Sequence, residues 1–274
     1  MCRVLRVSPS GYYDWQQRPD SRRMCENRKL LAEIRTIHAM SAETYGSLRV
    51  CAELQDNGYA CGRNRVARVM RVVGLQGIPK SHFRRTTTSG HKFPVAPNRL
   101  NRDFTATDPN QRWVADISYL RTGEGWLYLA VIRDLYSRKV VGWSTSVRLQ
   151  RALVLEALNM ALGRRTPTPG LIHHSDRGSQ YASHAFQKLL KDRGIVCRMS
   201  GTGNCYDNAV AESFFATLKR ERAHRRNYRT REEATADIFQ YIGVFYNRQR
   251  RHSWVRHRSP AQFEAAGRPE TRQL

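Results

Sequence analysis

The sequence lacks the features that mark membrane, secreted and zinc-bound proteins. It has no run of about 18 apolar residues, the length that a spanning helix needs, and its N-terminus has no apolar signal-peptide region. Its six cysteines form no Cys-x-x-Cys pair, and none has a histidine at zinc-finger spacing. A structural zinc site is therefore not expected. We expect a reduced cytoplasmic protein.

Acidic residues are also scarce. The 274 residues include 23 Asp+Glu against 47 Lys+Arg, which gives a formal net charge of +24. Such an excess predicts strong, salt-dependent attraction to a nucleic-acid backbone. The excess is +11 in residues 1–100, +5 in residues 101–214 and +8 in residues 215–274. The middle segment is the least basic, as expected of a segment that does chemistry between two DNA-binding arms.

Three carboxylates in the middle segment lie in contexts that would hold an acid in place. Asp116 interrupts an apolar run that predicts a buried strand, and Asp176 ends a second run before a turn. Glu212 lies in a stretch, 208–219, that predicts a helix. Two aspartates on strands and a glutamate on a helix can converge at one edge of a sheet. In a protein built to bind polyphosphate, such a cluster makes sense only if it holds metal ions.

The spacing of the three acids and the motifs around them point to one family. Asp176 and Glu212 enclose 35 residues, and Asp116 lies a further 60 positions upstream. This D-D-35-E pattern resembles the catalytic core of retroviral-integrase-like transposases. Three motifs carry a closer likeness: His173-His-Ser-Asp-Arg-Gly-Ser-Gln-Tyr181, Gly203-Asn-Cys-Tyr-Asp-Asn-Ala209 and Glu212-Ser-Phe-Phe-Ala-Thr-Leu-Lys219. From about residue 2 to residue 264 the chain resembles the second-reading-frame (OrfB type) transposase subunit of the bacterial insertion-sequence-three family.

The resemblance implies a DNA transposase that cleaves insertion-sequence ends and transfers the 3′-hydroxyl strand to another phosphodiester. In-line attack at phosphorus needs an activated water or 3′-hydroxyl and a stabilised leaving oxygen, which two divalent ions supply. Mg2+ prefers oxygen ligands, so three carboxylates can hold two Mg2+ (or Mn2+) ions. The family and this geometry together imply Asp116 as the bridging ligand, Asp176 on one ion and Glu212 on the other. No covalent nucleophile is required.

One basic helix is expected to contact DNA. In residues 63–73, the side chains of Arg65, Arg68 and Arg71 point away from a stripe of valine and methionine side chains. An apolar stripe opposite an arginine face fits a helix that packs on its neighbours and presents charge to DNA. A solvated basic face on an ordinary helical bundle is the alternative. The family resemblance, which implies a helix-turn-helix-like module here, favours DNA contact.

Two further residues share one face of the expected helix with Glu212. Lys219 follows Glu212 by two turns, and the resemblance implies that a basic residue here contacts the terminal DNA near the cleavage site. A surface ion pair is the alternative. Asn208, four positions before Glu212, either positions a phosphate or supports the start of the helix.

Other polar residues near the acids are expected to be structural. His173 and His174 alternate to opposite faces of their strand, which favours structural or supporting roles over metal binding. Asp134 ends the second expected strand, and Asp207 is expected to cap the Glu212 helix at its N-terminus.

The order of expected elements predicts an α/β fold. Three meandering strands and two more behind helical crossovers match a ribonuclease-H-like mixed five-stranded sheet with flanking helices, preceded by a small all-α helix-turn-helix-like domain. Strands are expected near 113–120, 126–133, 139–146, 171–176 and 195–199. Helices are expected near 26–39, 48–55, 63–73, 150–163, 183–193, 208–219 and 231–246. Before them, a short helix is expected to end in a turn made by Ser8, Pro9 and Gly11.

The chain is expected to divide into four regions. A helical, helix-turn-helix-like DNA-binding region covers 1–75, and a basic linker rich in proline covers 76–110. The ribonuclease-H-like integrase catalytic core covers 111–222. A C-terminal helical basic extension covers 223–274.

The resemblance also implies partners. They are double-stranded DNA, as insertion-sequence terminal repeats and as target, further copies of the chain in a multimer on DNA, and an upstream-frame protein joined by frameshifting. A bacterial, nucleoid-associated location follows, and no membrane partner is expected. Two other functions stay open: a ribonuclease-H-like nuclease without strand transfer, and an inactive DNA-binding regulator.

Overall fold

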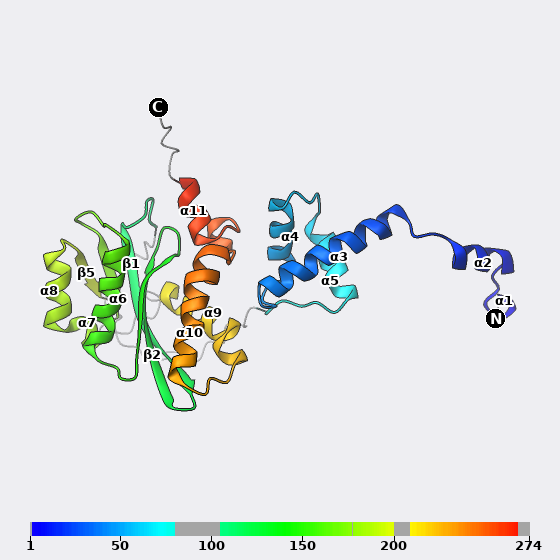
Figure 1. Cartoon of the computed structure of the whole chain (residues 1–274). Helices are drawn as coiled ribbons and strands as arrows, with labels where there is room; N and C mark the ends of the chain where they lie inside the picture. Colours follow the sequence, from blue (N-terminus) through cyan, green and yellow to red (C-terminus); the bar gives the residue numbers. More distant parts are fainter. Residues whose placement is uncertain (1, 80–104, 177, 200–208, 268–274) are drawn as a thin grey trace, which may run out of the picture. The chain divides into compact units, whose positions relative to one another are not determined.

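The structure, a computed structural model, forms two compact units, Met1–Lys80 and Ser81–Leu274. It describes residues 2–79, 105–176, 178–199 and 209–267. Figure 1 shows both units along the chain. Within these described ranges, no helix is both long and apolar enough to cross a membrane.

The first unit is helical throughout its described part. Its helices are α1 (Cys2–Leu5), α2 (Pro9–Gln17), α3 (Arg22–Met40), α4 (Ser47–Asp56) and α5 (Arg63–Val72). Helices α3, α4 and α5 pack against one another around a buried apolar set: Leu30, Ile34, Ile37, Val50, Leu54, Val66, Val69 and Met70. The all-α prediction for this region is confirmed, and α3 to α5 match the three expected helices to within a few residues at each end.

The turn expected after the first short helix is wrong. Ser8 is the N-cap of α2 and Pro9 is its first residue, and the Ser8 Oγ accepts the Gly11 N–H at 3.5 Å. Proline suits the first turn of a helix because the N–H that it lacks would have no intrahelical partner there. The same residue types that mark turns therefore start a helix here.

The second unit is built on a mixed five-stranded sheet. Its strands are β1 (Arg112–Thr122), β2 (Gly125–Asp134), β3 (Val140–Ser146), β4 (Ile172–Ser175) and β5 (Val196–Met199). Their spatial order is β3-β2-β1-β4-β5. The first three strands are antiparallel neighbours, while β4 is parallel to β1 and β5 is parallel to β4. The predicted ribonuclease-H-like sheet is confirmed.

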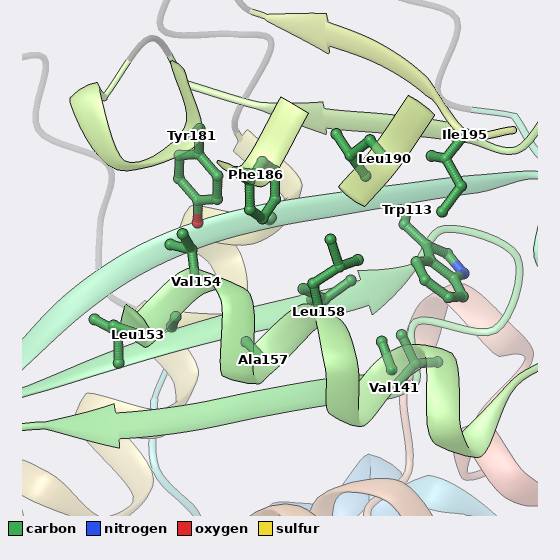
Figure 2. Close-up of a cluster of buried hydrophobic side chains, with 14 of the residues drawn as sticks. Trp113, Val141, Leu153, Val154, Ala157, Leu158, Tyr181, Phe186, Leu190 and Ile195 are labelled. Carbon is green, nitrogen blue, oxygen red and sulfur yellow. The ribbon is translucent and has the colours of Figure 1, made fainter. Parts of the chain in front are cut away.

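One face of the sheet is covered by α6 (Arg151–Arg164), α7 (Ser179–Ala182) and α8 (His184–Asp192). Figure 2 shows the apolar side chains that fill this layer, with Leu158 of α6 beside Trp113 of β1. Helix α6 lies very close to β3, because a Cβ added at Gly142 would stand 2.2 Å from the Ala157 carbonyl oxygen. Only glycine allows that approach.

The opposite face is packed by α9 (Ala209–Glu221) and α10 (Arg231–Gln240). The remaining elements of this part of the chain are η2 (Ala223–Arg225), η3 (Tyr241–Gln249), η4 (Ser253–Val255) and α11 (Pro260–Gly267). Figure 1 shows α9 and α10 on the side of the sheet away from α6 and α8. The helix expected at 231–246 is confirmed as α10 followed directly by η3, and its second half winds as a π-helix. The Asn247 side chain pairs with β3 there, accepting from the Val140 N–H and donating to the Val140 oxygen at 2.9 Å each.

Helix α11 is tied to the sheet by one buried carboxylate. Glu264 accepts hydrogen bonds from the Ser137 hydroxyl at 2.6 Å, the Lys139 ammonium at 3.1 Å and the Arg165 guanidinium at 2.7 and 2.8 Å. Burial opposes the charged form, but these donors outweigh it and hold the pKa of Glu264 below its ordinary value of 4.5.

Glu264→Gln is expected to lower the free energy of unfolding at pH 7 by about 1.5–3 kcal/mol, because charge-assisted hydrogen bonds are lost. Because the pKa of Glu264 is lower in the folded protein than in the unfolded chain, where it is near 4.5, its charge stabilises the fold fully above about pH 4.5. That stabilisation is lost as the pH falls through the pKa of the folded protein. The difference between variant and wild type should therefore shrink in acid. Urea unfolding at pH 7 and below pH 4 measures it.

The exposed Glu156 of α6 provides the matched control for that measurement. Glu156→Gln should change the free energy of unfolding by less than about 0.5 kcal/mol at either pH. Equal stability of Glu264→Gln and wild type at pH 7 would show that the buried contacts contribute nothing net.

Candidate active site

Two of the three carboxylates are brought together by strand register. Strand β4 pairs with β1 in parallel at a constant offset of 60 positions, as in the pair Val114 and His174. Continuing that register by two residues places Asp116 beside Asp176, on strands that lie about 4.8 Å apart. The 60-position spacing in the sequence is therefore the register of the β1–β4 pair.

Local backbone contacts fix the orientation of both aspartates. The Asp116 Oδ1 accepts the Ile117 N–H at 2.8 Å, and the Asp176 Oδ1 accepts the Gly178 N–H at 3.0 Å. A Cβ added at Gly178 would stand 3.0 Å from that same Asp176 oxygen, so the glycine permits the close turn. Both aspartates are half-buried. Asp116 lies within β1 and Asp176 directly follows β4, and both carboxylates remain accessible to water.

Tyr181 of α7 is a buried residue whose phenol lies near both aspartates. Its phenol is buried, and its hydroxyl has no hydrogen-bond partner among the described residues. Burial raises the pKa of Tyr181 most, and the negative charges of Asp116 and Asp176 raise it further, to well above 10.0. Both carboxylates thus act on one neutral phenol in α7.

Glu212 lies in the first turn of α9, and its side chain is exposed. The helix packs on β1, with Val210 against the buried Val114. The Arg133 guanidinium donates to the Val210 carbonyl oxygen at 2.6 Å and to the Tyr246 hydroxyl at 2.8 Å. A buried arginine at the end of β2 therefore positions the turn that carries Glu212.

Asp116 and Asp176 lie close together, and Glu212 lies on a helix that packs on the strand of Asp116. Within the described ranges, no group of three His, Cys, Asp or Glu side chains gathers tightly enough to hold a metal ion. Asp116 and Asp176 supply the paired oxygen donors that Mg2+ prefers, and Glu212 lies on the helix that packs on β1. The donor type and the pairing of the two aspartates suit a divalent ion.

The other polar residues near this edge are structural. Asp134 is fully buried and accepts the backbone N–H groups of Asn110 at 2.7 Å and Tyr136 at 2.9 Å. Burial, only partly offset by these bonds, raises its pKa. His173 is buried beside Phe186, and burial lowers its pKa to about 3, so the ring is neutral. His174 is also buried.

The residues expected to contact DNA are found in different settings. Arg65 is half-buried and paired, with Nε donating to Asn27 at 2.9 Å and Nη2 meeting Glu26 at 3.1 Å, whereas Arg68 and Arg71 are exposed. Lys219 lies over the Tyr119 ring, with its Nζ 5.0 Å from the ring centroid. The expected cap Asp207 and the expected phosphate contact Asn208 lie outside the described residues.

Sequence reasoning missed the parts of the site that depend on tertiary contacts. Arg133 and Tyr181 take part in it, and neither was singled out as a candidate. The available signal for Arg133 was a charge at the end of an otherwise apolar strand, Gly125–Asp134. The only signal for Tyr181 is its place in the motif that begins at His173.

Models of known domain families match most of the chain. An integrase core domain matches residues 106–205 and a second integrase core model matches residues 212–266. A helix-turn-helix-like domain matches residues 25–83.

Curated relatives match over nearly full length. An uncharacterised 31 kDa protein of insertion element IS600 from Shigella sonnei is 47% identical over 96% of this chain and 97% of its own length. The transposase InsF of insertion sequence IS3A from Escherichia coli is 45% identical over 96% of this chain and 92% of its own length.

Solved structures with a similar backbone are more distant in sequence. A simian T-cell lymphotropic virus intasome, solved with the PP2A regulatory subunit B56 gamma, matches 87% of this chain and 76% of its own chain at 15% identity and a TM-score of 0.49. The HTLV-2 integrase catalytic core domain in complex with magnesium matches 58% of this chain and 99% of its own at 15% identity and a TM-score of 0.44.

Proposed function

Because the chain belongs to the insertion-sequence-three (IS3) family of transposases, we propose that it cleaves insertion-sequence ends and transfers the freed 3′-hydroxyl strand by in-line chemistry. The observation that carries this proposal is the parallel register that sets Asp116 beside Asp176. Glu212 on α9 supplies the third carboxylate, and Arg133 fixes the turn from which it projects.

Each of the three carboxylates has a separate role as a metal ligand in this proposal. Asp116 would be the ligand shared by two Mg2+ (or Mn2+) ions, Asp176 would bind one of them and Glu212 the other. When bound, the two ions supply an activated attacking oxygen and a stabilised leaving oxygen. Asp116 and Asp176 are fixed by backbone N–H donors, whereas the exposed Glu212 side chain is free to adjust its rotamer toward them.

The bond changes balance without an external energy source. In cleavage, a water oxygen bonds to phosphorus, the bond from phosphorus to the 3′-oxygen of the element breaks, and that oxygen leaves as the 3′-hydroxyl. In transfer, this 3′-hydroxyl attacks another phosphodiester, whose own 3′-oxygen leaves. We propose that the first acceptor is the other end of the same element, giving a circular intermediate, and that target DNA follows.

The same proposal covers partners and regions. Two DNA ends must meet, which favours a homo-multimer on DNA, with the upstream-frame protein as a further partner and the nucleoid of a bacterial cytoplasm as the location. Exposed Arg68 and Arg71, together with Arg65, are the proposed DNA contacts of the helical region, and Lys219 and Asn208 those near the cut. The four-region division at 75, 110 and 222 remains a proposal.

Removal of divalent metal is expected to abolish both products. With Mg2+, the chain and a labelled duplex carrying the cognate terminal repeat should give a shorter cut strand and a longer joined strand on a denaturing gel. EDTA should remove both, and excess Mg2+ should restore them, because the carboxylates alone cannot activate the attacking oxygen.

The control is DNA binding in the same samples, which gel shift should show to persist in EDTA. The same reactions are run with the chain alone and with the chain fused to the upstream-frame protein. A cut product that never leads to a joined product would establish the nuclease alternative. Binding without either product in both arms would establish the inactive regulator, and joining in EDTA would rule out the metal mechanism.

A further inference from the structure

A concave site lies near the carboxylates on the same unit. It is a groove of about 610 Å³ between the β1–β2 hairpin and the segment that follows α9. Its lining residues are Tyr119, Leu120, Arg121, Thr122, Gly123, Trp126, Lys219, Ala223, His224, Arg226, Asn227 and Tyr228. We call it the hairpin groove. Its volume lies within the range of sites that bind small organic groups.

Two exposed aromatic rings form one wall of the hairpin groove. Tyr119 is 54% exposed and Trp126 is 48% exposed. Their ring centroids are 5.0 Å apart at 80°, so the rings meet edge to face and leave ring surface open. A folded chain of this composition gains nothing from leaving two large rings in water, which points to a ligand with a flat apolar face.

The charged side chains of the lining, Lys219, Arg121 and Arg226, are all basic. Lys219 lies over Tyr119, and Arg121, His224 and Arg226 are exposed. Arg226 also pairs with Asp237 at 2.6 Å. None of the described residues that line the groove carries a carboxylate. Aromatic faces interleaved with positive charge are the combination that binds single-stranded nucleic acid.

The hairpin is held against the opposite wall by backbone contacts. The Gly123 N–H donates to the Tyr228 oxygen at 2.9 Å, and the Arg231 guanidinium donates to the Glu124 oxygen at 2.6 Å and the Trp126 oxygen at 3.1 Å. A Cβ added at Gly123 would stand 2.5 Å from the Arg229 oxygen. The groove is therefore formed before any ligand arrives, which reduces the entropy lost on binding.

The groove is connected to the carboxylates by two elements. Tyr119 follows Asp116 by three residues of β1, and Lys219 follows Glu212 by seven residues of α9, each a distance of about 10 Å along its element. Three residues is an odd spacing on a strand, so the Asp116 and Tyr119 side chains leave opposite faces. The groove thus lies next to the carboxylates and is separate from them.

We propose that the hairpin groove binds an unpaired strand of the DNA at the end being cut, stacking a base on Tyr119 or Trp126 while Lys219 and Arg121 contact its phosphates. The ring faces require an unpaired strand, because bases inside a duplex are already stacked on both sides. At 3.4 Å per stacked nucleotide, the base would lie about three nucleotides from the cleaved phosphate. This inference rests on the proposed function, since it takes that DNA as the ligand.

The test compares single-stranded with duplex binding. Full-length protein in EDTA is titrated into fluorescein-labelled oligothymidylate and, separately, into a blunt duplex of equal length. Tyr119→Ala and Trp126→Ala should each weaken single-strand binding about tenfold and duplex binding less than about twofold. Tyr119→Phe and Trp126→Phe, which keep a ring, should stay within about twofold of wild type on both.

Phe239→Ala is the matched control, because Phe239 is 58% exposed on the same unit and outside the groove. It should leave both affinities unchanged. Equal losses on single strand and duplex, or no loss on either, would overturn the inference.

A second measurement avoids substitution in case the alanine variants unfold. An iodouracil-substituted single strand irradiated with wild-type protein should crosslink to Tyr119 or Trp126, identified by peptide mass spectrometry. Crosslinks confined to other residues would also overturn the inference. Because both readouts measure binding without metal, their failure would leave the cleavage and joining assay, and therefore the proposed function, untouched.

Discussion

Asp116→Asn, Asp176→Asn and Glu212→Gln are each expected to lower cleavage and joining by about 10³-fold or more. Each amide keeps the shape of the side chain and removes the charge that would hold a divalent ion at the reacting phosphate. Losing one electrostatic contact to a transition state costs about 10²–10³ in rate, and losing a metal ligand removes more, because that ion both activates the nucleophile and stabilises the leaving oxygen.

The readout is the same labelled-end assay, with gel shift and thermal unfolding on each variant. The exposed Asp192 at the end of α8 is the matched control, since Asp192→Asn removes an equal charge from the same unit. It should retain wild-type rates. A folded variant of Asp116, Asp176 or Glu212 that still joins DNA ends at a tenth of the wild-type rate or faster would show that its carboxylate is not a required ligand.

The paired aspartates could be predicted from sequence because local pattern and register carry the same information. An apolar run interrupted by Asp116 and another ended by Asp176 define two strands. Once those strands pair in parallel, the 60-position spacing fixes the two acids side by side. Five strands were placed to within a few residues for the same reason, since alternation and burial act along a few consecutive positions.

Features that depend on distant contacts could not be predicted in this way. The π-helix η3 follows an ordinary helical pattern, and its Asn247 side chain pairs with Val140, 107 positions earlier, a contact that local sequence does not encode. The hairpin groove needs Trp126 and Lys219 on one surface, a meeting that neither local sequence encodes. Pro9 and Gly11 suit a turn and a helix start equally, and the Ser8 cap decides between them.

Helix α9 connects the site to the C-terminal segment, because it is fixed at both ends. At its first turn, Arg133 donates to the Val210 carbonyl oxygen. At its last residue, the buried Glu221 accepts two bonds from Arg250, at 2.7 Å from Nε and 2.6 Å from Nη2, and one from the Tyr241 hydroxyl at 2.8 Å. Residues far beyond the catalytic motifs therefore determine where the Glu212 helix lies.

Glu221→Gln is accordingly expected to destabilise the protein strongly. The Glu221 and Arg250 side chains are each 6% exposed, and burial disfavours the charged guanidinium while Glu221 more than compensates and raises the pKa of Arg250. Removing the carboxylate leaves that cation buried without its counter-charge, which costs about 3–5 kcal/mol. For a unit of this size, the melting temperature should fall by roughly 6–20 °C.

Glu212→Gln is the matched control, because it makes the same chemical change on an exposed residue of the same helix. It should change the free energy of unfolding by less than about 0.5 kcal/mol while abolishing joining. Glu221→Gln, by contrast, should lower the free energy of unfolding. Adding Arg250→Met to Glu221→Met should recover part of the loss, since an apolar pair leaves no buried charge. If Glu221→Gln unfolds within about 1 kcal/mol of wild type in urea, the buried pair does not anchor α9, and the position of Glu212 depends on Arg133 and on the packing of α9 against β1.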